Sequence, residues 1–215
     1  MWKIIVLVIL IGFGAIVLMS YFLANQQLGG SLVLSQEDFS QLESMMSGEE
    51  SNETKSREFI DSFGKLEIEY SSDWKEIKDE NGFKGAIPEK VVEEYELEIL
   101  LLAGKLKKES FSQLMVSRGK FEGKSLEETI EIMKEINGAE GWATEIINPE
   151  FEGNEVFFEA VYRKENFHDL HSKEKIIMLD EEGLTYFAAF LVNDSDWESF
   201  KEEASNTIYS VQHIK

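Results

Sequence analysis

The chain has 215 residues, is 43% hydrophobic and 29% charged, and contains no cysteine. This length and composition suit one globular domain with accessory segments, and the lack of cysteine excludes disulfides, thiol catalysis, cysteine-based zinc sites and lipid attachment through a cysteine. The formal net charge of −21 repels phosphate backbones and anionic headgroups, which argues against nucleic-acid binding and leaves cations and basic proteins as attractive partners.

The first 24 residues predict a membrane anchor. Residues 4–24 carry no charged side chain and are apolar along nearly their whole length. About 20 residues at a rise of about 1.5 Å span the ~30 Å hydrocarbon layer, so we expect a transmembrane helix. A cleaved signal peptide is the alternative, but its apolar region usually has only ~7–15 residues and ends in a small-x-small site. The longer run, ending in Phe22-Leu23-Ala24, favours an uncleaved signal anchor.

The flanking charges predict the orientation of this anchor. Lys3 precedes the apolar run, and no further Lys or Arg occurs before Lys55, whereas Glu37 and Asp38 follow the run closely. The positive-inside rule therefore places the N-terminus in the cytoplasm. We expect a single-pass protein of the cell membrane with an extracytoplasmic C-terminal domain.

Residues 25–58 predict a juxtamembrane helix and a polar linker. The sequence Ser35-Gln-Glu-Asp38 resembles a capping box, and Phe39, Leu42 and Met46 follow it at helical spacing. Residues 47–58 contain no apolar side chain and are typical of a linker. The globular domain is expected at residues 59–215.

The residue pattern of the globular domain predicts seven strands, and the short turns between them indicate that the strands are antiparallel. The candidate strands are 65–70, 96–104, 111–118, 142–148, 155–164, 172–180 and 184–192. Short polar turns at 148–154 and 180–183 join two pairs of these strands, as in β-hairpins.

The central strands predict that both faces of this sheet are covered. In "EVFFEAVYR", Val156 and Phe158 are on one side and Phe157 and Val161 on the other, whereas a sheet with one wet face alternates with polar residues. Capping boxes Ser125-Leu-Glu-Glu and Ser195-Asp-Trp-Glu start two amphipathic helices, and Pro88 is suited to the first turn of a shorter one. We therefore predict an α+β fold, a largely antiparallel sheet with helices on both faces (an α/β/α sandwich), in the order β-β-β-α-β-β-β-β-α.

Three stretches resemble the PsbP/Mog1-like superfamily over about residues 63–213. "LEIEYSSDWKEI" resembles its opening strand, with Ser71 in place of the usual proline. "SLEETIEIMKEI" resembles the helix after its third strand, and "EGLTYFAAFLVNDSDWESFKEEASNTIYSVQ" its terminal strand and helix. The resemblance implies an antiparallel sheet flanked by helices and a binding or assembly role rather than catalysis. The anchored, acidic setting best matches the bacterial envelope members of the superfamily.

Two groups of residues are weak candidates for a metal site. The first is the histidine cluster, in which two imidazoles three residues apart could share a metal on a helix, although its polar flanks predict a solvated loop instead. The second is the acidic turn, whose oxygens suit a hard cation but lack the spacing of a calcium loop. These candidates are His168, Asp169, His171, Asp180, Glu181 and Glu182. We expect no cofactor and no catalytic residue.

The glycine-containing loop at 119–125 and several large aromatic residues are better explained by structure than by ligand binding. The loop "GKFEGKS" at 119–125 has only three residues between its glycines, whereas a phosphate-binding loop has four and needs a parallel sheet. Trp74 follows the turn Ser71-Ser72-Asp73 directly, and we expect it to be buried under a helix at the end of the sandwich. Trp142, Trp197 and the pair Phe157-Phe158 are likewise expected in the core.

These observations predict a membrane-anchored, non-catalytic domain that binds a protein partner or a small ligand. One alternative is an assembly factor of a membrane complex, which an exposed apolar patch would favour. Another is a metal-dependent or acid–base enzyme, which requires His168, His171 and two carboxylates to converge in a cleft.

Overall fold

The computed structural model describes residues 56–61, 65–76, 89–107, 110–139, 141–179 and 183–214. The expected membrane anchor, the juxtamembrane helix and the acidic turn Asp180-Glu181-Glu182 lie outside these residues. Among the helices of the described ranges, none has both the length and the apolar character needed to cross a membrane.

A seven-stranded sheet forms the centre of the fold, in the order β3-β4-β5-β9-β8-β7-β6. Its strands are β3 (Lys75–Glu76), β4 (Glu98–Lys107), β5 (Ser110–Lys120), β6 (Ala143–Glu152), β7 (Glu155–Arg163), β8 (Leu170–Leu179) and β9 (Leu184–Asn193). Every neighbouring pair is antiparallel, which confirms the prediction from the hairpin turns. The predicted strands from 96–104 onward all lie in this sheet.

A second sheet of three strands contains the predicted strand 65–70. Its order is β1 (Ser56–Ile60), β2 (Leu66–Ser71) and β10 (Gln212–His213). Strand β1 begins at Ser56, so it includes residues that we had predicted as linker. Only Phe59 of β1 is partly buried, and a strand with this pattern shows no apolar alternation in its sequence. It is defined by its pairing with β2 instead.

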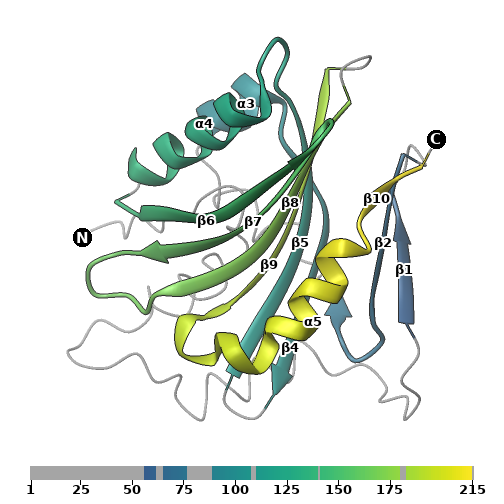
Figure 1. Ribbon diagram of the computed structural model, residues 1–215, viewed down its shortest axis with the longest axis vertical. Helices are drawn as coiled ribbons and strands as arrows, with labels where there is room; N and C mark the ends of the chain where they lie inside the picture. Colours follow the sequence, from purple (N-terminus) through teal and green to yellow (C-terminus); the bar gives the residue numbers. More distant parts are fainter. Residues whose placement is uncertain are drawn as a thin grey trace, which may run out of the picture.

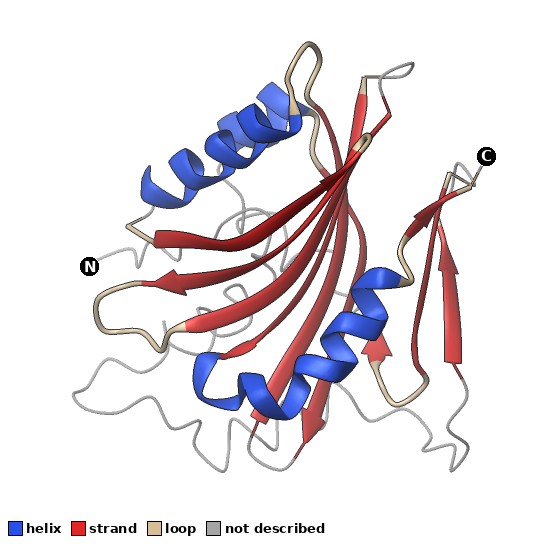
Figure 2. Cartoon of the chain, in the orientation of Figure 1, coloured by secondary structure: helices blue, strands red, loops and turns tan. Residues whose placement is uncertain are grey.

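The helices and the small sheet cover the two faces of the main sheet. The helical segments of the described residues are α3 (Glu89–Tyr95), α4 (Leu126–Ala139), the 3-10 turn η1 (Asp194–Asp196) and α5 (Trp197–Tyr209). Helices α3 and α4 lie on one side of the main sheet, and α5 lies on the other with the three-stranded sheet beside it (Figure 1). Helices on both faces were predicted. The second face is also covered by the sheet β1-β2-β10, which was not predicted as a separate layer (Figure 2).

Each face of the main sheet has its own hydrophobic core. On the α4 side, Phe187 and Leu191 of β9 pack with Met133 of α4. On the α5 side, Phe190 of the same strand packs with Phe200 of α5. Burial of both faces explains why the central strands are apolar on both sides.

The two predicted capping boxes have different outcomes. Ser125 and Glu128 form the box at α4, because Ser125 N donates to Glu128 Oε2 at 2.8 Å and Glu128 N donates to Ser125 Oγ at 3.2 Å. The prediction of a capping box at Ser195 is wrong. Helix α5 begins at Trp197, and its N-cap Asp196 makes no side-chain capping bond. The preceding residues form η1, in which the carboxylate of Asp194 lies 2.8 Å from Nδ1 of His171.

The predicted turn at 148–154 is shorter in the structure. Strand β6 continues to Glu152, and only Gly153 and Asn154 separate it from β7. A β-bulge interrupts the pairing between Ile147 and Glu150, with Asn148 at φ 48°. The bulge lets a proline-containing segment remain in an edge strand, so these residues have a turn-like composition without ending the strand.

Trp74 is completely buried, at 0% exposure. Its ring meets Phe190 edge-on at a centroid distance of 5.1 Å, and its Nε1 donates to Glu203 Oε1 of α5 at 2.9 Å. The predicted role of Trp74 as a packing residue under a helix is confirmed. Trp142, Trp197, Phe157 and Phe158 are also buried in the core.

Candidate functional site

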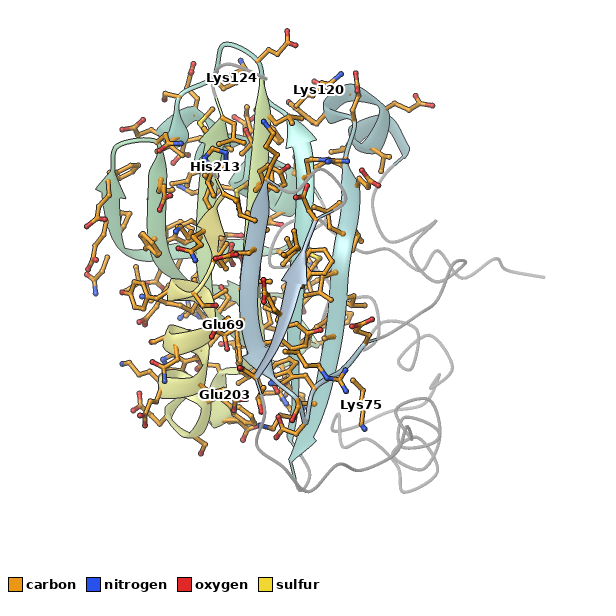
Figure 3. The ribbon with its side chains drawn as sticks, turned by 90° about the vertical axis from the view of Figure 1, so that its right-hand side faces the viewer. Glu69, Lys75, Lys120, Lys124, Glu203 and His213 are labelled. Carbon is orange, nitrogen blue, oxygen red and sulfur yellow. The ribbon has the colours of Figure 1, made fainter. Side chains whose placement is uncertain are left out.

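A pocket of about 270 Å³ lies between the β5–α4 turn and the β8–β9 hairpin. Its apolar lining includes Phe121, Met178 and Leu184, and its polar lining includes Lys124 and Thr185. Figure 3 places Lys120 and Lys124 at one end of the molecule and Glu203 at the other, so this pocket is far from the buried Trp74. The lining thus mixes apolar and polar side chains, as small-ligand sites do.

The pocket contains one buried polar group without a partner. Thr185 is 1% exposed, and its Oγ1 has no hydrogen-bond partner. Buried polar atoms are nearly always hydrogen-bonded, so an unpaired hydroxyl beside a pocket is unusual. Lys124 is exposed at the edge of the same pocket. The lining therefore offers apolar surface, one hydroxyl, one cation and the carboxylate of Glu122.

A glycine lets the two turns approach each other. Gly183 has φ +63°, and a Cβ atom at this position would lie 2.8 Å from Cγ of Glu122. The left-handed backbone favours glycine, and a Cβ atom here would require the side chain of Glu122 to move. The shape of the pocket thus depends on Gly183 in the hairpin and Glu122 in the turn.

The geometry of "GKFEGKS" does not suit phosphate binding. The amides of Ser125 and Glu128 at the start of α4 already donate to side chains of the capping box. Lys120 is paired with Glu96 at 2.6 Å, and Glu122 lines the pocket beside Lys124. The neighbouring strands β5 and β9 are antiparallel, whereas a phosphate-binding loop needs a parallel sheet.

The predicted histidine candidates are separated in the structure. His168 and Asp169 lie in the loop before β8, where Asp169 Oδ2 is 3.4 Å from Nε of Arg163. His171 lies within β8 and is only 8% exposed. The prediction of a solvated loop is therefore wrong for His171. Strand β8 begins at Leu170, and within it the imidazole is buried.

His171 is enclosed by side chains of three other elements. Its Nδ1 lies 2.8 Å from Asp194 Oδ1 and its Nε2 lies 3.4 Å from Glu159 Oε2. Its ring stacks on Trp197 at 3.9 Å with an angle of 6°. Within the described ranges, no group of three or more His, Asp or Glu side chains is placed to hold a metal. The described candidates do not form the metal site that their spacing suggested, and Asp180, Glu181 and Glu182 lie outside the described residues.

A buried polar cluster on the α4 side of the sheet was missed by sequence reasoning. Glu174 is 0% exposed, and its Oε1 accepts hydrogen bonds from Ser172 Oγ, at 2.5 Å, and from Tyr162 OH. Burial raises the pKa of Glu174 to about 7 and raises the pKa of Tyr162 well above its usual value. The available signal was a polar pair, Ser172 and Glu174, spaced two apart on the strand face that otherwise carries Leu170, Ile176 and Met178.

Comparison with known proteins adds evidence about the fold. The solution structure of cyanobacterial PsbP (CyanoP) from Synechocystis matches with a TM-score of 0.51 and 15% sequence identity, covering 78% of this chain and 98% of that chain. The chain therefore shares its fold with cyanobacterial PsbP. This confirms the fold that the three sequence stretches predict.

Two other solved structures are similar to the chain at lower scores. The Ran-binding protein Mog1p of Saccharomyces cerevisiae has a TM-score of 0.48 and 10% identity, covering 74% of this chain and 96% of that chain. LpqN of Mycobacterium tuberculosis, involved in cell envelope biogenesis, has a TM-score of 0.42 and 6% identity, covering 84% of this chain and 98% of that chain. No protein-family model and no curated protein sequence matches the chain. At such identities the similarity concerns the fold, and function must be argued from the site.

Proposed function

We propose that the chain is a membrane-anchored, extracytoplasmic and non-catalytic domain that binds a small ligand at the pocket between the β5–α4 turn and the β8–β9 hairpin. The observation that carries this proposal is the pocket of about 270 Å³ with the buried, unpartnered hydroxyl of Thr185. The fold supports it, because its resemblance implies binding or accessory roles. The apolar run at residues 4–24 supports the anchor.

The contacts of His171 support a non-catalytic role. Both of its ring nitrogens lie beside carboxylates, and its ring face is covered by Trp197. An imidazole held in this way joins β8 to η1 and α5, whereas a general base needs a nitrogen within reach of a substrate proton. We therefore assign His171 to the stability of the fold.

The exposed apolar side chains give less support to an assembly factor. Three large ones are exposed in the described residues, and they lie on three different elements: Ile60 in β1, Phe151 in β6 and Tyr209 in α5. Single exposed apolar residues are normal on a protein surface. A protein partner is consistent with the acidic charge of the chain, which would attract a basic surface.

The ligand proposal can be tested with the full-length protein in detergent micelles. A library of small molecules with one polar group would be screened by thermal shift, and hits would be measured with Thr185→Val and with Thr207→Val, a buried threonine of α5. We expect ligands whose affinity falls at least tenfold with Thr185→Val and stays within twofold with Thr207→Val. Hits that respond equally to both variants would contradict binding at this pocket.

The topology needs a separate experiment. The chain would be expressed in bacteria with a C-terminal tag, and spheroplasts would be treated with protease. We expect the tag to be degraded from outside while the protein sediments with membranes, and a variant without residues 4–24 to leave the membrane fraction. Protection of the tag in intact spheroplasts would contradict the extracytoplasmic orientation.

A further inference from the structure

The pocket at the β5–α4 turn has two opposite charges on its exposed side. Its lining contains Glu122 and Lys124, and both side chains are exposed. Lys124 N donates to Phe121 O at 3.2 Å and closes a tight turn, in which Gly123 has φ +70° at the third position, as a type II turn requires. One turn therefore places a carboxylate and an ammonium group beside the same cavity.

The carboxylate of Glu122 is positioned against the β8–β9 hairpin. Its Cγ and Oε1 lie 2.8 and 3.3 Å from the place that a Cβ atom of Gly183 would occupy, so the side chain extends from the turn onto the hairpin backbone. Two separate segments of the chain thus hold this charge at the edge of the pocket.

Both charges are available to a ligand. Among the ion pairs of the described residues, none includes Glu122 or Lys124. The neighbouring cation, Lys120, is paired with Glu96 at 2.6 Å. The pKa of Lys120 is raised mainly by Glu96, with a smaller contribution from Glu122. Lys120 therefore does not neutralise Glu122.

The inner wall of the pocket is apolar and is held in place by its neighbours. Phe121 is buried, and its ring stacks on Tyr95 at 4.5 Å and meets Phe187 edge-on at 5.2 Å. Met178 and Leu179 of β8 line the same pocket and are buried as well. Since the wall is already ordered, an apolar group that packs against it does not have to order these side chains on binding.

We propose that the pocket binds a small zwitterion with an apolar side chain, as in an aliphatic α-amino acid, whose ammonium group pairs with Glu122 and whose carboxylate pairs with Lys124. This inference rests on the proposed function and names the ligand class of its pocket. A simple anion would be repelled by Glu122 and a simple cation by Lys124, whereas a zwitterion is attracted by both.

The size of the pocket and the charge of the chain agree with this class. The volume of about 270 Å³ is below the ~300–1,000 Å³ of pockets for drug-sized ligands, so the occupant is a smaller molecule. The net charge of −21 further disfavours a simple anion. A zwitterion has no net charge and is not subject to this repulsion.

The experiment is isothermal titration calorimetry of the full-length protein in detergent micelles with L-leucine at pH 7. Two analogues lack one charge each, since 4-methylpentanoate has no ammonium group and 3-methylbutylamine has no carboxylate. L-Serine has both charges and no apolar side chain. We expect saturable binding of one leucine per chain, and binding of the other three compounds that is weaker by about tenfold or more.

Matched variants of the two charges should change the ligand preference in opposite directions. Glu122→Gln keeps the shape of the side chain and removes the repulsion of anions, so it should reduce the advantage of leucine over 4-methylpentanoate to about threefold or less. Lys124→Gln should do the same for the advantage over 3-methylbutylamine. Glu198→Gln and Lys201→Gln, the same charge changes at exposed positions of α5, should leave every affinity within about twofold. Far-UV circular dichroism and melting would confirm that each variant folds.

The outcomes separate the ligand class from the pocket. The zwitterion is ruled out if leucine does not bind saturably, if its binding is unchanged in both charge variants, or if each variant changes the affinity for all compounds equally. In these cases the proposed function still stands when other library compounds bind and lose affinity with Thr185→Val. Both proposals fail if neither leucine nor any library compound binds in a way that depends on Thr185.

Discussion

Trp74 and Glu203 are joined by a hydrogen bond of 2.9 Å from the indole Nε1 to Oε1, across 129 residues of sequence. The same oxygen accepts from Nζ of Lys105 at 2.9 Å, and Lys105 also pairs with Asp73 at 2.7 Å. The carboxylate of Glu203 therefore bonds α5 both to Lys105 of β4 and to Trp74, which follows the turn after β2.

We expect Glu203→Ala to lower the free energy of unfolding by about 1–3 kcal/mol, because it leaves the buried indole N–H without an acceptor. Lys105 would keep Asp73 as its partner. Urea denaturation followed by tryptophan fluorescence measures the change. Glu202→Ala, at the exposed neighbouring position, serves as the control and should change the stability by less than about 0.5 kcal/mol. Equal effects of the two variants would show that the bond to Trp74 is not stabilising.

Glu174 should make the stability of the protein decrease as the pH rises. Its pKa is about 7 in the folded state, above the usual 4.5, so the folded protein binds this proton more tightly than the unfolded chain does. The stabilising effect is complete below pH 4.5 and is lost as the pH rises through 7. The shift corresponds to about 3 kcal/mol.

The Glu174→Gln variant should remove this dependence. Urea denaturation of both proteins between pH 4.5 and 9 gives the free energy of unfolding at each pH. We expect the value for the variant to rise relative to that of the parent chain as the pH rises. Parallel pH profiles would contradict the assignment of a raised pKa to Glu174. The exposed substitution Glu198→Gln controls for the change in net charge.

Asp61 connects the β1–β2 hairpin to the main sheet. Its Oδ1 accepts from the amides of Lys65 and Leu66 at 2.6 and 3.0 Å, and its Oδ2 accepts from Tyr186 OH at 3.0 Å and lies 3.6 Å from Nη1 of Arg118. We expect Asp61→Asn to lower the free energy of unfolding by about 1.5–3 kcal/mol, because a buried charged acceptor is lost.

A double-mutant cycle would isolate the bond between Asp61 and Tyr186. Tyr186→Phe removes the donor while keeping the ring, and the two substitutions together should cost about 0.5–3 kcal/mol less than the sum of their separate effects. Denaturation by urea at pH 7 provides the four values. Additive effects would mean that the 3.0 Å contact contributes nothing to stability.

Gly183→Ala should destabilise the protein by about 1–2 kcal/mol, because alanine disfavours a positive φ. The contact of 2.8 Å with Glu122 adds to the cost. Gly138→Ala is the matched control, since nothing lies within 4 Å of a Cβ atom there and Gly138 is helical. It should stabilise the protein by about 0.5–1 kcal/mol. Thermal melting would compare the two, and equal shifts would contradict the role of Gly183.

The long elements of the fold were predictable from the sequence because their signals are local. Alternating or two-sided apolar patterns marked the strands from β4 to β9, and the reciprocal box of Ser125 and Glu128 marked the start of α4. The packing role of Trp74 followed from its place after a polar turn. Each of these signals depends on residues within one turn or one strand of each other.

The short strands had no such signal. Strand β1 is mostly polar and exposed, while β3 and β10 have two residues each. Each forms by pairing with another strand, and the partner of β10 is far away in the sequence, since Gln212 pairs with Glu67 of β2. No window of a few residues contains the information for such a contact.

The sequence by itself determined the apolar run at its start, the long antiparallel strands and the two longer helices, because local periodicity is sufficient for these. Only the tertiary structure decided that His171 lies between Asp194, Glu159 and Trp197 rather than in a metal site. It also decided that Glu174 and Gln113 are buried on one face with unpartnered atoms. The physical reason is that burial and hydrogen-bond partners depend on strands that pair across the sheet, and these pairs are set by long-range packing.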